Sequence, residues 1–133
     1  MTEKSPNQLV NAFELASIAA NIAESKKALD VVVLDTGKVS YIADYFVICS
    51  GESTAQIRTI ADTIEKTFRQ KGQIRIGNGQ DPSYKWCLLD YGDIVIHIMH
   101  RTERQFYQLE NFWNHATVVP PEEWLNKRLQ EAS

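Results

Sequence analysis

Two apolar runs that meet at a polar turn dominate the hydrophobic pattern of this chain. Residues 86–90 read Trp-Cys-Leu-Leu-Asp, residues 94–99 read Ile-Val-Ile-His-Ile-Met, and Tyr-Gly-Asp stands between them. Strong strand formers on both sides of a turn residue such as Gly92 predict a β-hairpin. Because side chains alternate between the two faces of a strand, the three isoleucines of the second run share one face. That face must belong to the core.

The register of this hairpin decides what shares a face with Trp86. A two-residue loop at Tyr91-Gly92 pairs Asp90 with Asp93 and places Trp86 beside His97. A three-residue loop with a left-handed glycine places Trp86 on the isoleucine face instead. Tyrosine is a poor residue for the positive φ of a type I′ turn, so the sequence leaves both registers open. In the first register a second face, which needs a covering helix or a partner, carries Trp86, Leu88, Val95, His97 and Met99.

Helical spacing predicts a helix over residues 7–27, and short continuous apolar runs predict strands at 31–34 and 45–49. The apolar arc of this helix is wider than one sheet contact requires. Either the helix is half-wrapped by its own domain, or part of the arc packs on a second copy of the chain.

A second helix has clear start and stop signals. Ser53 with Gln56 forms a capping box, and Gly72 supplies the C-terminal stop. Its core stripe consists of Ile57, Ile60, Ala61, Ile64 and Phe68. Residues 73–76 alternate like a short strand, and residues 77–83 form a loop by composition.

The capping-box pattern recurs in the last third of the chain. Thr102 with Gln105 predicts a helix whose apolar side carries Phe106, Leu109 and Trp113. Pro121 suits the first turn of a final helix. The element order therefore predicts an α/β fold of the mixed α+β kind, with a sheet of about five strands and flanking helices.

Composition indicates one soluble domain. The chain has 133 residues, 44% of them hydrophobic, and no apolar run of about 18 residues that would span a membrane. The N-terminus carries no apolar signal core, so we expect a cytoplasmic protein. Cys49 and Cys87 lie in apolar strand runs, which predicts buried, reduced thiols rather than a disulfide or a metal pair. A net charge of −3 argues against generic nucleic-acid binding and suits a basic protein partner.

Candidate catalytic chemistry is weakly supported by the residues. Gly51-Glu52-Ser53, at a strand-to-helix turn, could receive an anion, but a tight turn with a helix cap is the more ordinary interpretation. Metal-dependent phosphoryl transfer needs two carboxylates on one strand, whereas a turn separates Asp90 from Asp93. We therefore expect these two aspartates to cap backbone N–H groups of the turn.

The histidines do not form a metal pair by spacing. His97 and His100 are three residues apart on a strand, so they point to opposite faces. Trp86, Tyr91 and Met99 are either core filling or, taken together, a surface for a protein partner.

A set of motifs runs through most of the chain, from about residue 8 to Trp113. They comprise Ala43–Ser53, Ile60-Ala-Asp62, Trp86, Asp90-Tyr-Gly-Asp93, His97 and Arg104–Trp113. Together these motifs resemble the ribosomal silencing factor (RsfS, Iojap) family. The resemblance implies residues 1–113 as the family domain and 114–133 as a C-terminal helical extension. Two departures are Asn78-Gly79, where the family often has Glu-Gly, and Phe112-Trp113 in place of the usual Leu-Trp.

The resemblance also implies a function without catalysis. It implies a nucleotidyltransferase-like fold that lacks catalytic metal ligands, no cofactor, and frequent homodimers. Family members bind ribosomal protein L-fourteen on the large subunit and obstruct joining of the small subunit. The tryptophan and the acidic turn belong to the partner-binding surface, which here implies Trp86, Asp90, Tyr91, Gly92 and Asp93. The strand-face argument adds Leu88 and Met99.

Two other classes of function remain open from the sequence. One is a nucleotidyltransferase that uses Ser53 and the acidic turn. The other is a dimeric adaptor whose partner lies off the ribosome.

Overall fold

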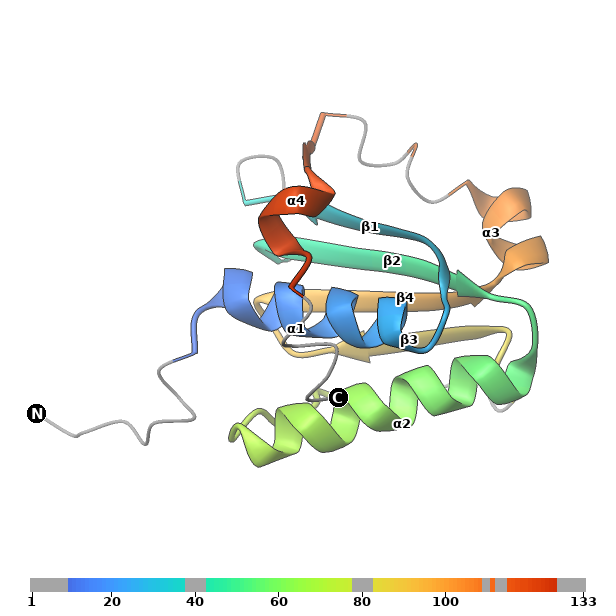
Figure 1. The fold of residues 1–133 in the computed structure, drawn as a ribbon, viewed down its shortest axis with the longest axis horizontal. Coiled ribbons are helices and arrows are strands. Elements are labelled where there is room, and N and C mark those ends of the chain that lie inside the picture. The colour runs from blue at the N-terminus through green and yellow to red at the C-terminus, as the bar shows by residue number, and fades with distance from the viewer. Residues whose placement is uncertain (1–9, 38–42, 78–82, 109–110, 112–114, 127–133) are drawn as a thin grey trace, which may run out of the picture.

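A mixed five-stranded sheet in the order β3-β4-β2-β1-β5 forms the centre of the fold (Figure 1). The computed structural model describes residues 10–37, 43–77, 83–108, 111 and 115–126. The elements are α1 Ala12–Ser25, β1 Leu29–Asp35, β2 Tyr45–Gly51, α2 Thr54–Gln70, β3 Trp86–Asp90, β4 Ile94–His100, α3 Arg101–Tyr107, β5 Thr117–Val119 and α4 Pro121–Trp124. The central strands β2 and β4 are parallel, and the other neighbouring pairs are antiparallel. The predicted fold class is confirmed.

The two long helices lie on the same face of the sheet. Figure 1 shows α1 and α2 side by side across that face, with α4 near α1 and α3 at the end of β4. The main core cluster lies under these helices and includes Cys49 and Cys87, which are fully buried as predicted. A smaller cluster, of Leu34, Ala43, Phe46, Ile48 and Val95, lies on the opposite face.

The wide apolar arc of α1 is covered by the chain itself. Residues 15–23 are all buried, and α1 contacts β1, β2, α2 and α4. Asn21 fastens α4 in place: its Nδ2 donates to the carbonyl of Trp124 (2.6 Å), and its Oδ1 accepts from the backbone N–H of Asn126 (2.8 Å). Of the two interpretations of this helix, wrapping by its own domain is the one observed.

The start of α2 follows its capping signal. Ser53 Oγ accepts from the backbone N–H of Gln56 (3.1 Å), while the Gln56 amide accepts from Glu52 N–H (2.8 Å). A Cβ on Gly51 would lie 2.8 Å from Cγ1 of Ile57, so only glycine permits this close approach of strand and helix. The residues of the predicted core stripe, Ile57, Ile60, Ala61, Ile64 and Phe68, are all fully buried.

The strand predicted at residues 73–76 is wrong. The segment is irregular, and Ile74 is 83% exposed. The backbone N–H of Ile76 donates to the carbonyl of Asp90 (2.7 Å), and Arg75 forms an ion pair with Glu65 on α2 (3.2 Å). These contacts tether the segment beside β3 without forming a ladder, and β5 is the fifth strand instead.

The helix predicted from Thr102 begins two residues earlier than its capping pattern indicated. His100 is the N-cap, and its Nδ1 accepts from the backbone N–H of Thr102 (3.3 Å). Gln108 adopts a left-handed conformation (φ 47°) and ends the helix. Phe106 is 80% exposed and does not face the core, while Leu109 and Trp113 lie outside the described residues.

Both predicted hairpin registers are wrong. Asp90 pairs with Val95 and Trp86 with Met99, so the pairing is shifted by two residues from the first prediction. The loop consists of Gly92 and Asp93. The glycine has a φ of 86°, and the backbone N–H of Asp93 donates to the carbonyl of Tyr91 (3.2 Å). Because Gly92 has the positive φ, Tyr91 does not need one. A shift of two residues preserves the faces, so Trp86 shares a face with the side chains that the first register placed there.

Candidate protein-interaction surface

Trp86 opens β3 on the face of the sheet opposite α1 and α2. Its indole Nε1 donates to Nδ1 of His97 (3.0 Å), and the two ring centroids are 5.9 Å apart. One part of the Trp86 side chain is buried against this neighbour and the rest is exposed. The ring is therefore held in one orientation before any partner binds.

His97 is suited to hold that ring because it is neutral. Only 7% of the residue is exposed, and burial lowers the pKa of its imidazole to about 4. The neutral ring can accept at Nδ1, whereas a proton on Nδ1 would remove the acceptor. Phe46 packs on the other side of His97, with ring centroids 5.5 Å apart.

Leu88 and Met99 differ in their access to solvent. Leu88 is half-buried on the Trp86 face and packs against the smaller core cluster. Met99 pairs with Trp86 across the hairpin and has no exposed surface. Met99 therefore lies on the same face of the sheet as Trp86 but presents no side-chain surface to solvent.

The hairpin turn lies at the far end of β3. Trp86 and Asp90 are four residues apart on one strand, roughly 13 Å. The carboxylate of Asp90 accepts from the backbone N–H of Gly92 (2.8 Å), which confirms its predicted role as a turn cap. Asp93 is exposed at the tip.

Tyr91 belongs to the opposite face. Its ring lies against Phe68 of α2, with centroids 4.7 Å apart. Burial is the main cause that raises the pKa of its phenol to about 12, and the charge of Glu65 adds to the shift. The seven predicted site residues therefore do not form one cluster. Five lie along an elongated stripe, Met99 is buried on the same face, and Tyr91 packs on the opposite face.

Sequence reasoning missed two further aspartates at the acidic end of the hairpin. The backbone N–H of Asp44 donates to the carbonyl of Asp93 (2.8 Å), so the start of β2 lies beside the turn. Asp35 pairs with Tyr45 at the same end of the sheet. Burial, with added effects of the Asp35 and Asp44 charges, raises the pKa of Tyr45. The parallel pairing of β2 with β4, which the sequence does not specify, brings these aspartates together.

Residues that catalysis could use have structural partners instead. His100 Nε2 lies 3.1 Å from the carbonyl oxygen of Glu52, and Ser53 caps α2. Burial raises the pKa of the Cys49 thiol to about 12. Within the described ranges, no three His, Cys, Asp or Glu side chains are placed to hold a metal ion, and no helix is long and apolar enough to cross a membrane.

Comparisons with known proteins agree on one family. Residues 10–133 match a family model described as "Ribosomal silencing factor during starvation". A protein of Halalkalibacterium halodurans named ribosomal silencing factor RsfS is 39% identical over 80% of this chain and 91% of its own length. A protein of Bacillus subtilis with the same name is 37% identical over 83% of this chain and 93% of its own length. A crystal structure of a Chromobacterium violaceum protein is similar with a TM-score of 0.72 and 28% identity, covering 76% of this chain and 84% of that one.

Proposed function

This chain belongs to the ribosomal silencing factor family, and from that membership we propose that it binds the large ribosomal subunit through ribosomal protein L-fourteen. Bound there, it blocks joining of the small subunit and represses translation in the cytoplasm. The contact surface is the stripe of Trp86, Leu88, Asp90, Gly92 and Asp93, with Met99 buried on the same face and Tyr91 packed on the opposite face.

One observation carries the proposal: the partly exposed ring of Trp86 is fixed in place by the buried His97. Tryptophan is among the residues that most often dominate the energy of protein interfaces. A ring that is already ordered loses little conformational entropy when a partner covers it. The Trp86 end of the stripe is therefore suited to anchor a protein.

The acidic residues at the hairpin-turn end of the stripe favour a basic partner. Asp90 and Asp93 lie in the hairpin turn, and Asp44 adjoins them through its backbone hydrogen bond to Asp93. Complementary charge steers association and disfavours wrong partners. An acidic end on the same stripe as an aromatic anchor suits a basic protein surface better than the phosphate backbone of RNA.

The proposed mechanism is steric and needs no chemical step. A protein that occupies the subunit interface raises the free energy of joining by its own binding free energy to that site. At a free concentration about 100-fold above its dissociation constant, this amounts to roughly 2.7 kcal/mol. We propose a regulatory protein rather than an enzyme, because Ser53 and Asp90, the groups that a nucleotidyltransferase would use, cap backbone N–H groups.

Subunit joining, followed by light scattering, tests this function. Large subunits would be preincubated with increasing concentrations of the protein, and small subunits would then be mixed in. We expect the scattering increase to fall as the protein saturates the large subunits. An unchanged increase at saturating protein would refute the proposal.

The same preparations separate the two other classes of function. A dimeric adaptor that acts off the ribosome would stay at the top of a sucrose gradient and leave joining unchanged. A nucleotidyltransferase would bind a nucleotide in the presence of Mg²⁺ and lose that binding on Ser53→Ala.

A further inference from the structure

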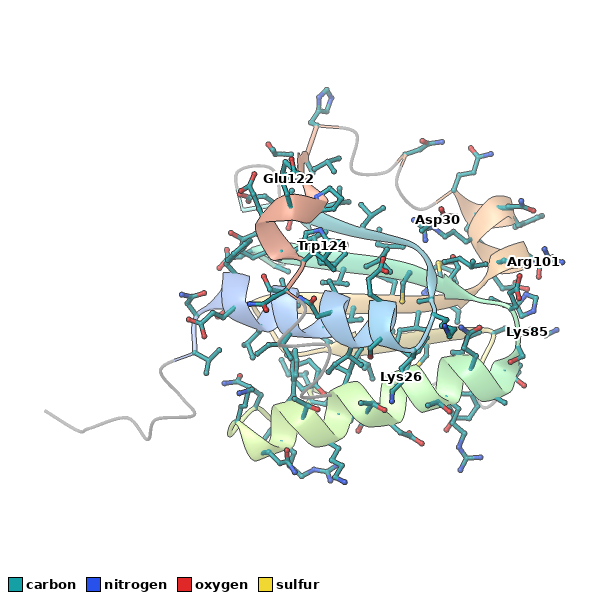
Figure 2. All side chains as sticks on the ribbon, viewed as in Figure 1. Lys26, Asp30, Lys85, Arg101, Glu122 and Trp124 are labelled. Atoms are coloured by element: carbon teal, nitrogen blue, oxygen red, sulfur yellow. The ribbon has the colours of Figure 1, made fainter. Side chains whose placement is uncertain are left out.

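The short helix α3 is held rigidly against the sheet. Arg104 is 8% exposed, and its Nη1 donates to Oγ of Ser50 (3.1 Å) and to the carbonyls of Leu29 and Asp30. These acceptors belong to β2 and to the irregular start of β1, where the ladder register shifts. Figure 2 shows Arg101 and Lys85 at the end of the molecule where α3 begins, and the backbone N–H of His100 donates to the carbonyl of Lys85 (2.7 Å). The helix is thus anchored at its start and in its middle.

The outer side of this anchored helix carries two aromatic residues. Phe106 is 80% exposed and Tyr107 is 46% exposed, and their ring centroids are 5.0 Å apart in an edge-to-face arrangement. Exposing two adjacent aromatic rings to water is unfavourable, and packing of α3 against the core does not offset it. Exposed apolar patches of this kind often mark interaction sites. Neither ring is needed to fix α3, because Arg104 and the His100 cap already do so.

The ring of Tyr107 lies next to Trp86, and together with Phe106 it extends the candidate interaction surface. Tyr107 lies 4.9 Å from Trp86 between ring centroids. A row of rings therefore runs from the core to solvent, in the order Phe46, His97, Trp86, Tyr107 and Phe106. The buried rings of Phe46 and His97 thus limit the positions available to Trp86 and, through it, to Tyr107 and Phe106.

A hollow adjoins the exposed end of this row. It has a volume of about 260 Å³ and is lined by Phe106, Tyr107, Gln108 and Asn111. The opening could receive one apolar side chain from a protein partner, in the way that interface anchors fill pockets. Amide groups at its rim, from the glutamine and the asparagine, could satisfy a backbone group beside that side chain.

We propose that Phe106 and Tyr107 of α3 are part of the partner-binding surface and form one contact area with Trp86. The occupant is the same ribosomal protein that the hairpin stripe binds, so this inference rests on the proposed function. The ring contact between Trp86 and Tyr107 makes the surface continuous. A partner that covers the tryptophan must come within reach of α3.

Substitutions at two exposed positions test the inference. Phe106→Ala removes an exposed ring from α3, and Ile74→Ala removes an apolar side chain of similar exposure (83%) from the segment after α2. Binding of each purified variant to isolated large subunits would be measured beside wild type and Trp86→Ala, with thermal melting to compare folding. We expect Phe106→Ala to melt like wild type and to bind about tenfold or more weakly. Ile74→Ala should bind like wild type.

The outcomes separate this inference from the function on which it rests. If Trp86→Ala loses binding and Phe106→Ala binds like wild type, α3 lies outside the interface and the inference is wrong, while the proposed function stands. If the wild-type chain itself does not bind large subunits, both are wrong. Equal weakening by Ile74→Ala would also overturn the inference, because the loss would then not depend on α3.

Discussion

At the scale of single residues, His97 couples the candidate site to the stability of the fold. It lies between Phe46 and Trp86, and its neutral Nδ1 is the acceptor for the indole N–H. Binding a proton there would require charge in a buried position and would break this hydrogen bond. The residue therefore accepts the hydrogen bond of the Trp86 ring only while it remains neutral.

This coupling predicts a pH dependence of stability. Burial lowers the pKa of His97 from 6.5 to about 4, so between these values the unfolded chain binds more protons than the folded one. The free energy of unfolding should fall as the pH drops from 6.5 towards 4, by up to about 3 kcal/mol from this residue. Urea unfolding at several pH values measures it.

His97→Gln is the matched control for that measurement. Its amide oxygen can still accept from the Trp86 indole, but the side chain does not titrate. The variant should lose less stability than wild type over the same pH range. Equal losses in both proteins would contradict the assignment, because other groups would then account for the dependence.

At the scale of elements, the last segment of the chain is built into the fold. β5 pairs with β1, and α4 packs on α1 through the buried Trp124 and the amide of Asn21. Figure 2 places Trp124 between α4 and the layers beneath it. This segment covers apolar surface of α1 that would otherwise face water.

Substitution of Trp124 measures how strongly α4 is held. The side chain is 3% exposed, and its indole Nε1 has no hydrogen-bond partner in the described part of the chain. Trp124→Ala should lower the free energy of unfolding by about 3–5 kcal/mol, through lost burial and the cavity it leaves. Chemical denaturation provides the measurement.

Trp124→Phe separates burial of the ring from its polar group. It keeps most of the apolar surface and removes the unpaired N–H, so we expect a change of less than about 1.5 kcal/mol. A large loss with phenylalanine, similar to the loss with alanine, would show that α4 depends on the indole nitrogen and not on burial.

Sequence patterns predicted those elements whose signals are local. The stripe from Ile57 to Phe68 with its Ser53 cap defined α2, and continuous apolar runs located β1 and β2. Residues 73–76 alternate as a strand does, yet tertiary contacts with Glu65 and Asp90 hold them as an irregular segment. Periodicity cannot distinguish these outcomes, because the deciding contacts lie outside the window.

The candidate interaction surface was also predictable only as far as its signals are local. Alternation along the hairpin left two registers open for Trp86. The first of them put Trp86 on the face of His97, and that part of it holds because a shift of two residues preserves strand faces. The exposure of Phe106 was not predictable. It depends on Arg104 reaching the backbone of β1, a contact between residues about 75 positions apart along the sequence.

At the scale of the whole molecule, charge and apolar surface are separated along the hairpin. The acidic end has Asp35, Asp44 and Asp93, whereas the other end has the Trp86 and α3 rings with Lys85 and Arg101 nearby. A partner that complements both ends can bind in only one orientation. Correct orientation matters for a mechanism that works by occupying space.

This separation predicts salt-dependent binding. The double substitution Asp44→Asn with Asp93→Asn removes two charges while leaving their backbone hydrogen bond intact. The association rate with large subunits should fall by roughly two- to tenfold at low salt, and the difference should shrink as salt rises. Stopped-flow binding at several salt concentrations measures both effects.

Asp62→Asn on α2 is the control for that substitution, because its exposed carboxylate lies on the helix that covers the opposite face of the sheet. It should leave the association rate and its salt dependence unchanged. If it slows association as much as the double substitution does, net charge and not the acidic end governs the encounter.

The central proposal is that this protein binds the large ribosomal subunit through the surface around Trp86. Co-sedimentation of wild type and Trp86→Ala with purified large subunits through a sucrose gradient tests it most directly, with thermal melting to verify that the variant folds. We predict that wild type sediments with the large subunits and that the folded variant stays at the top, since loss of such an anchor costs about 2 kcal/mol or more. A folded Trp86→Ala variant that co-sediments as wild type does would contradict the account.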